Sequence, residues 1–137
     1  MAKDLFHEAV KTALIKDGWT ITDDPLTLPF GNRKLYVDLA AEKLITAEKL
    51  NQRIAVEVKS FTGRSAMADL EKAIDQYVMY TSALARHEAD RVLYLALPKE
   101  VYAELTNDQV VGILSEEMRI RLVVYNPVDQ TLVRWIG

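Results

Sequence analysis

Residues 34–42 (KLYVDLAAE) and 53–59 (RIAVEVK) decide the fold. In both stretches apolar side chains alternate with polar or small ones, which is the period of a β-strand with one buried face. The first strand is expected to have two faces. One face holds Leu35, Val37, Leu39 and Ala41, and the other holds Lys34, Tyr36, Asp38 and Ala40. The second strand is expected to bury Ile54, Val56 and Val58, and to present on its opposite face Arg53, Ala55, Glu57 and Lys59.

The surrounding segments continue an α/β pattern. We expect helices over about residues 4–16, with Asp4 as the cap, and about 66–85, and one or two short helices within 98–117. Expected strands are 19–21, 91–97, 119–125 and 131–136, and the two prolines and one glycine of residues 23–32 indicate a loop. This order predicts one domain over residues 1–137, an α/β fold in which a mixed β-sheet is flanked by helices on both faces.

Composition narrows the class of protein. The 137 residues are 50% hydrophobic with a net charge of −3, which suits a globular domain and argues against binding nucleic acid over the whole surface. The absence of cysteine excludes disulfides, cysteine-ligated zinc and a cysteine nucleophile. The first residues do not form a secretory signal and no apolar run could cross a bilayer, so we expect a cytoplasmic protein without membrane contact.

Positive charge is concentrated in residues 31–64, which hold seven basic and four acidic side chains. Chance clustering on a solvated face is one interpretation. The other is a basic rim, including Arg33, Lys34 and Arg64, around a few carboxylates, which would suit a polyanion such as DNA.

Three polar side chains should meet on one patch of the sheet. In a strand, residues two apart point the same way, so Glu57 and Lys59 share a face. An antiparallel hairpin that pairs Asp38 with Glu57 brings all three together, and the same register sets Glu42 opposite Arg53, a favourable opposite-charge pair.

This trio suits a metal-dependent phosphodiesterase. Two carboxylates, with the backbone carbonyl of Val58 as a further oxygen ligand, could hold Mg²⁺ or Mn²⁺, and the metal would activate water. Lys59 could orient that water or neutralise developing charge. The competing interpretation is a surface salt bridge on a solvated face.

Two further positions could serve the same site. Gln76 and Tyr80 are four residues apart on the long helix and share a stripe with Ala73 and Ala83. This stripe lies next to the main apolar one, which we expect to hold Leu70, Ile74, Tyr77, Val78, Thr81 and Leu84. Gln76 is either an amide aimed at the site or a surface amide bound to water.

Glu8 is either an added metal ligand or an acid placed favourably near a helix start, and its neighbour His7 is read as a surface or capping residue.

These residues resemble the PD-(D/E)XK nuclease superfamily, in particular its RecB-like and archaeal resolvase-like branches. The resemblance rests on Val37-Asp38-Leu39, on Ala55-Val56-Glu57-Val58-Lys59 and on Gln76-x-x-x-Tyr80, after a helix that carries an acidic residue. It implies a restriction-endonuclease-like fold with Asp38 and Glu57 as metal ligands, Lys59 as the catalytic lysine and Glu8 as the helix-borne ligand. Gln76 and Tyr80 would then order the site or contact nucleic acid. Tyr36-Val37 stands where the superfamily often has a proline before the aspartate.

Over nearly its whole length the chain resembles the XisH family, the fdxN element excision controlling factors of filamentous cyanobacteria. The opening MAKDLFHEAV, the segments 36–39 and 54–61, and Asn126-Pro127 before Trp135 carry this resemblance. It implies a role in developmentally programmed, site-specific DNA excision, with DNA, a site-specific recombinase and a XisI-like protein as partners.

Two functions therefore stay open. The first is a magnesium-dependent endonuclease, and the second is a non-catalytic DNA- or recombinase-binding accessory protein that keeps the nuclease fold. A toxin–antitoxin-like or defence pair with the XisI-like partner is a third, weaker alternative. Whether the chain forms a homo-oligomer, which DNA it would recognise, and whether the XisI-like partner regulates the site are not decided by the sequence.

Overall fold

The structure, a computed structural model, describes residues 4–44, 51–63 and 65–137. Its helices are α1 (His7–Lys16), α2 (Ala66–His87), α3 (Lys99–Asn107) and the short π-helix η1 (Ile113–Glu117). Its strands are β1 (Thr20–Asp23), β2 (Leu26–Phe30), β3 (Arg33–Val37), β4 (Leu39–Lys43), β5 (Gln52–Val58), β6 (Arg91–Pro98), β7 (Leu122–Asn126) and β8 (Thr131–Ile136).

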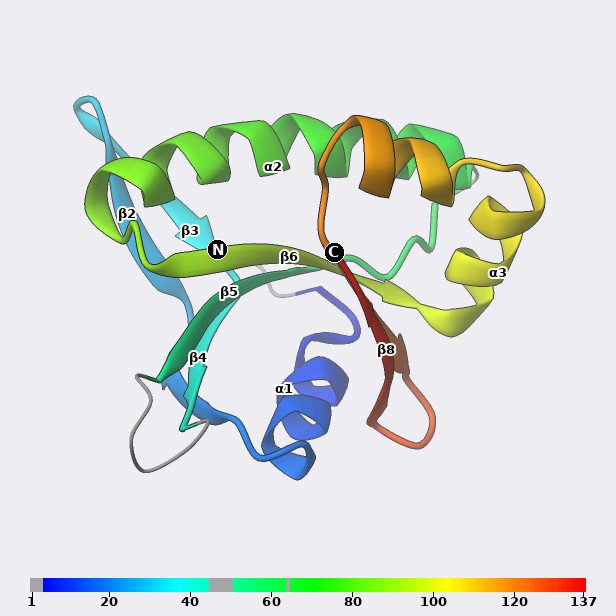
Figure 1. The fold of residues 1–137 in the computed structure, drawn as a ribbon, viewed down its shortest axis with the longest axis horizontal. Coiled ribbons are helices and arrows are strands. Elements are labelled where there is room, and N and C mark those ends of the chain that lie inside the picture. Colours follow the sequence, from blue (N-terminus) through cyan, green and yellow to red (C-terminus); the bar gives the residue numbers. More distant parts are fainter. Residues whose placement is uncertain (1–3, 45–50, 64) are drawn as a thin grey trace.

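A six-stranded mixed sheet forms the centre, in the order β1-β4-β5-β6-β7-β8. The neighbours β5, β6 and β7 run parallel, and the remaining pairs are antiparallel. Helix α1 covers one face with Val10 and Leu14, while α2 lies along the other with Leu70 and Tyr77 (Figure 1). The predicted mixed sheet with helices on both faces is therefore confirmed.

The predicted register is also confirmed, but the first strand is not one strand. Glu42 pairs with Arg53 and Leu39 with Val56, so continuation of the register sets Asp38 opposite Glu57. At Asp38 the chain bends between β3 and β4, and β3 leaves the main sheet to pair with β2. Val37 consequently packs on the α2 side and Leu39 on the α1 side, so the predicted single apolar face was wrong.

Strand β2 occupies part of the predicted loop. Leu26 and Leu28 are buried and alternate with exposed Thr27 and Pro29, and the strand joins β3 through a turn at Gly31-Asn32. A proline cannot donate a ladder hydrogen bond, which normally argues against a strand interior. In a two-stranded sheet each strand has a free edge, so Pro29 is tolerated there.

Helix α2 is rotated about its own axis relative to the orientation that its apolar stripe alone predicts. Its buried side chains are Leu70, Ala73, Tyr77, Tyr80, Ala83 and Leu84, whereas Val78 is 63% exposed and Thr81 is exposed. The alanines let the helix approach the sheet closely, and the stripe that carries Gln76 and Tyr80 therefore faces the sheet. Ser65 caps the N-terminus of the helix, and its side chain accepts a hydrogen bond from the Ala68 N–H.

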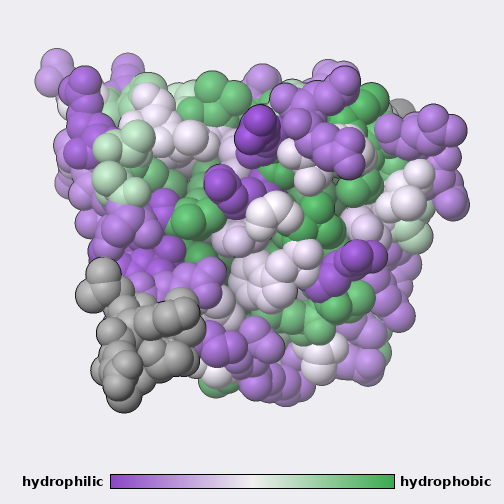
Figure 2. All heavy atoms as spheres, viewed as in Figure 1, coloured by the Kyte–Doolittle hydropathy of each residue, from purple (hydrophilic) through white to green (hydrophobic). Residues whose placement is uncertain are grey.

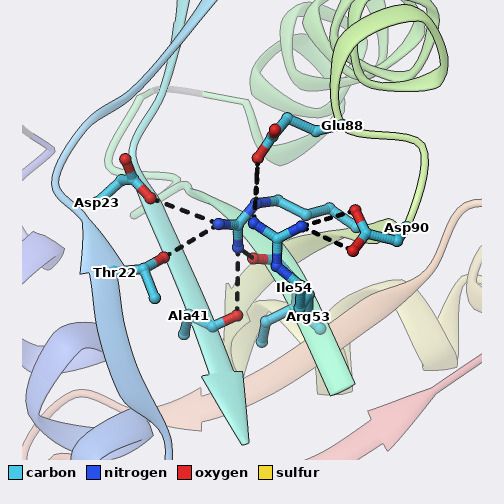
Figure 3. Close-up of polar contacts among 8 residues, drawn as sticks. Thr22, Asp23, Ala41, Arg53, Ile54, Glu88 and Asp90 are labelled. Atoms are coloured by element: carbon cyan, nitrogen blue, oxygen red, sulfur yellow. Dashed lines mark hydrogen bonds and ion pairs between the residues drawn. The ribbon is translucent and has the colours of Figure 1, made fainter. Parts of the chain in front are cut away.

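A buried arginine fastens one end of the sheet (Figure 3). The Arg91 guanidinium donates to the carbonyls of Ala41 and Ile54 and to the Thr22 hydroxyl, and it pairs with Glu88. Burying this charge is tolerated because its N–H groups find acceptors. Four strands are thus joined through one side chain.

None of the described helices is both long and apolar enough to span a membrane.

The packing of α2 predicts a contrast between two positions on the same helix. Leu70→Ala should lower the free energy of unfolding by about 2–5 kcal/mol, because it removes a side chain that is 1% exposed. Val78→Ala should change it by no more than about 0.5 kcal/mol, since Val78 faces solvent. Urea unfolding of both variants measures the difference, and a large cost at Val78 would contradict the observed helix orientation.

Candidate functional site

The Asp38 segment and the Glu57–Val58 segment exchange hydrogen bonds where the β4–β5 ladder ends. Glu57 Oε1 accepts from the Asp38 N–H at 3.2 Å, and Asp38 Oδ2 accepts from the Val58 N–H at 2.8 Å. The bend at Asp38 removes the next ladder partners, and buried N–H groups without acceptors are costly. Each carboxylate therefore supplies the acceptor that the other segment needs.

The two carboxylates are buried together with one cation beside them. Asp38 is 7% exposed and Glu57 5%, and Lys59 Nζ lies 3.6 Å from Glu57 Oε2. Burial and the nearby Asp38 carboxylate raise the pKa of Glu57 to about 8, and Lys59 opposes this rise only in part. The predicted convergence of these three side chains is what the geometry shows.

Tyr80 and Gln76 approach from α2, on the same side of the sheet. Burial, the charges of Glu57 and Asp38, and hydrogen bonding to Glu57 raise the pKa of Tyr80, so its phenol remains a proton donor at neutral pH. Among the described residues, the Gln76 Oε1 atom is buried without a hydrogen-bond partner. A surface amide bound to water does not fit this position. Such an orphaned acceptor is unusual in a folded protein and suits a group that a ligand completes.

The segment after β5 is held by residues from distant parts of the chain. Asp4 Oδ2 accepts from the Ser60 N–H at 3.0 Å, and the Tyr125 hydroxyl donates to the Lys59 carbonyl at 3.0 Å. The predicted capping role of Asp4 was wrong, since α1 begins at His7 with Phe6 as its N-cap. Asp4 instead accepts from the Phe6 N–H and fixes the main chain that carries Lys59.

His7 is buried, so its interpretation as a surface or capping residue was wrong. Its Nε2 lies 2.7 Å from Asp24 Oδ1, while Lys11 Nζ lies 2.8 Å from Asp24 Oδ2. Partial burial would raise the pKa of Asp24, but the hydrogen bonds from Lys11 and His7 outweigh it and lower that pKa. The sequence signal for this cluster was the spacing of His7 and Lys11, which places both side chains on one face of a helix.

The roles of the remaining candidates stay predictions. Glu8 is exposed on α1, and no group of three or more His, Asp or Glu side chains within the described residues is arranged to hold a metal, so its role as a ligand stays a prediction. Val58 gives its N–H to Asp38, and the use of its carbonyl as a ligand also stays a prediction. Arg33 and Lys34 are exposed on β3, and Arg64 lies outside the described residues.

The donor set fits a hard divalent cation. Mg²⁺ in phosphoryl-transfer sites is held by one or two carboxylates and completes its shell with water and substrate oxygens. Asp38 and Glu57 supply two adjacent carboxylates whose mutual repulsion a cation would relieve. The same cation would compete with the backbone hydrogen bonds that both side chains accept.

Comparisons with known proteins agree with the resemblance to the XisH family. The family model described as XisH protein matches residues 1–133. An XisH family protein from Nostoc punctiforme PCC 73102 is 38% identical, with a TM-score of 0.85 over 98% of this chain and 100% of that one. A fdxN element excision controlling factor protein from Anabaena variabilis is 42% identical, with a TM-score of 0.84 over the same shares. The comparison with curated proteins gives no match.

The raised pKa of Glu57 predicts a component of stability that is lost in base. The folded state holds this proton up to about pH 8, against an ordinary pKa of 4.5, so the contribution is full below about 4.5 and disappears as the pH rises through 8. Glu57→Gln, which is neutral at every pH, should lack this loss and gain stability over the wild type between pH 5 and 9. Urea unfolding across that range measures it, with exposed Glu104→Gln as the control. Parallel profiles for Glu57→Gln and the wild type would contradict the assignment.

Divalent metal should stabilise the fold through the same pair. Millimolar Mn²⁺ at pH 8 should raise the Tm, because a ligand that binds only the folded state shifts unfolding by mass action. Asp38→Asn keeps an acceptor for the Val58 N–H but removes the charge, so it should fold and lose the Mn²⁺ response. Asp108→Asn, at the exposed residue that caps the C-terminus of α3, serves as the control and should respond like the wild type. An unchanged wild-type melting curve would count against the metal site.

Proposed function

Because the chain belongs to the XisH family, we propose that it controls site-specific excision of a DNA element and that Asp38, Glu57 and Lys59 form a magnesium-dependent endonuclease site. The reaction would be hydrolysis of a DNA phosphodiester by water. The observation that carries the catalytic part is the buried Asp38–Glu57 pair with Lys59 3.6 Å from Glu57. The PD-(D/E)XK superfamily assignment belongs to this proposal and is supported by the matching order of Asp38, Glu57, Lys59, Gln76 and Tyr80 along the chain.

Each side chain has a distinct task in this proposal. When bound, Mg²⁺ would supply an activated water and charge neutralisation at the phosphate, with Asp38 and Glu57 as its ligands. Lys59 would hold the attacking water or a phosphate oxygen through its ammonium group. Tyr80 would keep the Glu57 carboxylate oriented by hydrogen bonding, and Gln76 would complete the ligand environment with its unpartnered oxygen.

A non-catalytic accessory role is the second candidate, and the same hydrogen bonds favour it. Both carboxylates already have a structural function, because they accept the N–H groups of Asp38 and Val58 at the end of the ladder. A protein that retained the fold only to bind DNA, a recombinase or a XisI-like partner would still need this pair. Activity therefore distinguishes the two candidates better than geometry does.

Plasmid cleavage tests the catalytic proposal. The wild type should nick or linearise supercoiled DNA in Mg²⁺ or Mn²⁺ and not in EDTA. Lys59→Ala should lose this activity by at least about a hundredfold, the scale of removing one electrostatic stabiliser from an active site. Lys72→Ala, which removes an exposed lysine of α2, should leave cleavage intact. Cleavage that survives Lys59→Ala would come from another source and would favour the accessory role.

Gln76 offers a test that separates function from packing. Gln76→Ala removes a buried oxygen that lacks a partner, so the free energy of unfolding should not fall by more than about 0.5 kcal/mol. DNA binding in Ca²⁺, which can support binding without cutting, should weaken by about 1–2 kcal/mol if the amide contacts the bound substrate or its metal. Fluorescence anisotropy measures the affinity. Equal affinities for Gln76→Ala and the wild type would remove Gln76 from the site.

A further inference from the structure

The β2–β3 hairpin is a two-stranded ribbon that stands apart from the main sheet. It forms its own antiparallel sheet, in which Phe30 pairs with Arg33 beside the Gly31-Asn32 turn. Leu26 and Leu28 pack its base against the α2 side of the core. Its turn projects past the side of the molecule, and the projecting end is hydrophilic (Figures 1 and 2). The ribbon is thus anchored at one end and exposed at the other.

The exposed end of the ribbon carries only positive charge. Residues 25–37 include Arg33 and Lys34 and no acidic residue. Across a hollow of about 340 Å³ lined by Phe30 and Gly31 lie Arg86 and His87, from the last turn of α2. Three permanent cations therefore surround the ribbon end, from two separate elements.

These cations are not used to hold the fold. Within the described part of the chain, Arg33, Lys34 and Arg86 make neither ion pairs nor side-chain hydrogen bonds, and all three are exposed. Nearby Arg53 differs, since it pairs with Asp90 at 2.7 Å and with Glu88 at 3.4 Å. Unpaired cations grouped at a projecting edge leave their charge available to an anionic partner.

The two cations of the ribbon lie on opposite faces. Arg33 lies on the same face as Leu35, toward α2, and the alternation of a strand turns Lys34 to the opposite face. The major groove of B-DNA admits a two-stranded β-ribbon, and phosphates line both of its walls. A ribbon with one cation on each face can therefore contact phosphates on both sides of a groove.

We propose that the β2–β3 ribbon, with Arg86 beside it, is the surface that docks duplex DNA. This inference rests on the proposed function, in which DNA is the ligand. It assigns the structural element that binds the DNA. Strand β3 runs directly into Asp38, so Lys34 lies about 13 Å of extended chain from the acidic pair. Duplex held by the ribbon would be positioned beside Asp38 and Glu57 by a continuous strand.

Salt-dependent binding tests the ribbon. Fluorescence anisotropy of a labelled 30-base-pair duplex in EDTA, at a series of NaCl concentrations, gives the slope of log K against log [NaCl]. Each of Arg33→Ala, Lys34→Ala and Arg86→Ala should weaken binding and reduce that slope by about 0.9, the value for one lost phosphate contact, and the triple variant by about 2.7. Lys72→Ala, on the other half of α2, should bind like the wild type. Thermal melting of every variant checks that the fold is retained.

The outcomes distinguish the ribbon from the nuclease proposal. Wild-type slopes in the three variants, or a wild type that binds no duplex even at low salt, would overturn the ribbon. Asp38→Asn should lose cleavage but keep the wild-type slope, because binding in EDTA needs no metal. Ribbon-dependent binding without any cleavage would support the ribbon while the nuclease proposal fails. Cleavage that is unaffected in the triple variant would support the nuclease proposal and overturn the ribbon.

Discussion

The structure depends on the reciprocal hydrogen bonds between the Asp38 and Glu57 segments. Where β3 departs from the main sheet, the backbone ladder of β4 and β5 ends inside the protein, and the N–H groups of Asp38 and Val58 need acceptors. Two carboxylates meet that need. The bend and the acidic pair are therefore one feature, because a straight strand would have supplied carbonyls and left no reason to bury two acids.

The neighbourhood of this pair offsets the cost of burying it. A raised pKa lets Glu57 carry a proton at neutral pH, which reduces repulsion from Asp38. Asp4 and Tyr125 fix the main chain at Ser60 and Lys59, so the ammonium group remains near Glu57. At the opposite end of β4 and β5, Arg91 binds carbonyls of both strands. The two strands that carry the site are thus fastened at each end by buried side chains.

The sequence predicted the convergence of Asp38, Glu57 and Lys59 better than the strands that hold them. The wholly apolar face of residues 53–59 placed Glu57 and Lys59 together, and the Glu42–Arg53 charge pair set the register. The bend at Asp38 could not be predicted, because alternation from Leu35 to Ala41 also fits a straight strand. Strand β2 could not be predicted because it contains Pro29, and a proline is tolerated in a strand only where the strand has a free edge. On α2, apolarity favoured Val78, but the small size of Ala73 and Ala83 decides which stripe can approach the sheet.

The uneven charge explains how a chain with a net charge of −3 could still engage DNA. The hollow of about 510 Å³ between Phe61 and α3 is lined by Glu100, Glu104 and Asp108. Burial, followed by the charges of Asp4 and Glu100, raises the pKa of Tyr125, whose hydroxyl donates to the Lys59 carbonyl. A polyanion approaching from α3 would therefore meet repulsion, whereas the ribbon side presents unpaired cations. Repulsion on one flank and attraction on the other restrict the direction of approach, which a uniformly basic surface cannot do. The net negative charge of this chain is for that reason compatible with the proposed docking of DNA on the ribbon.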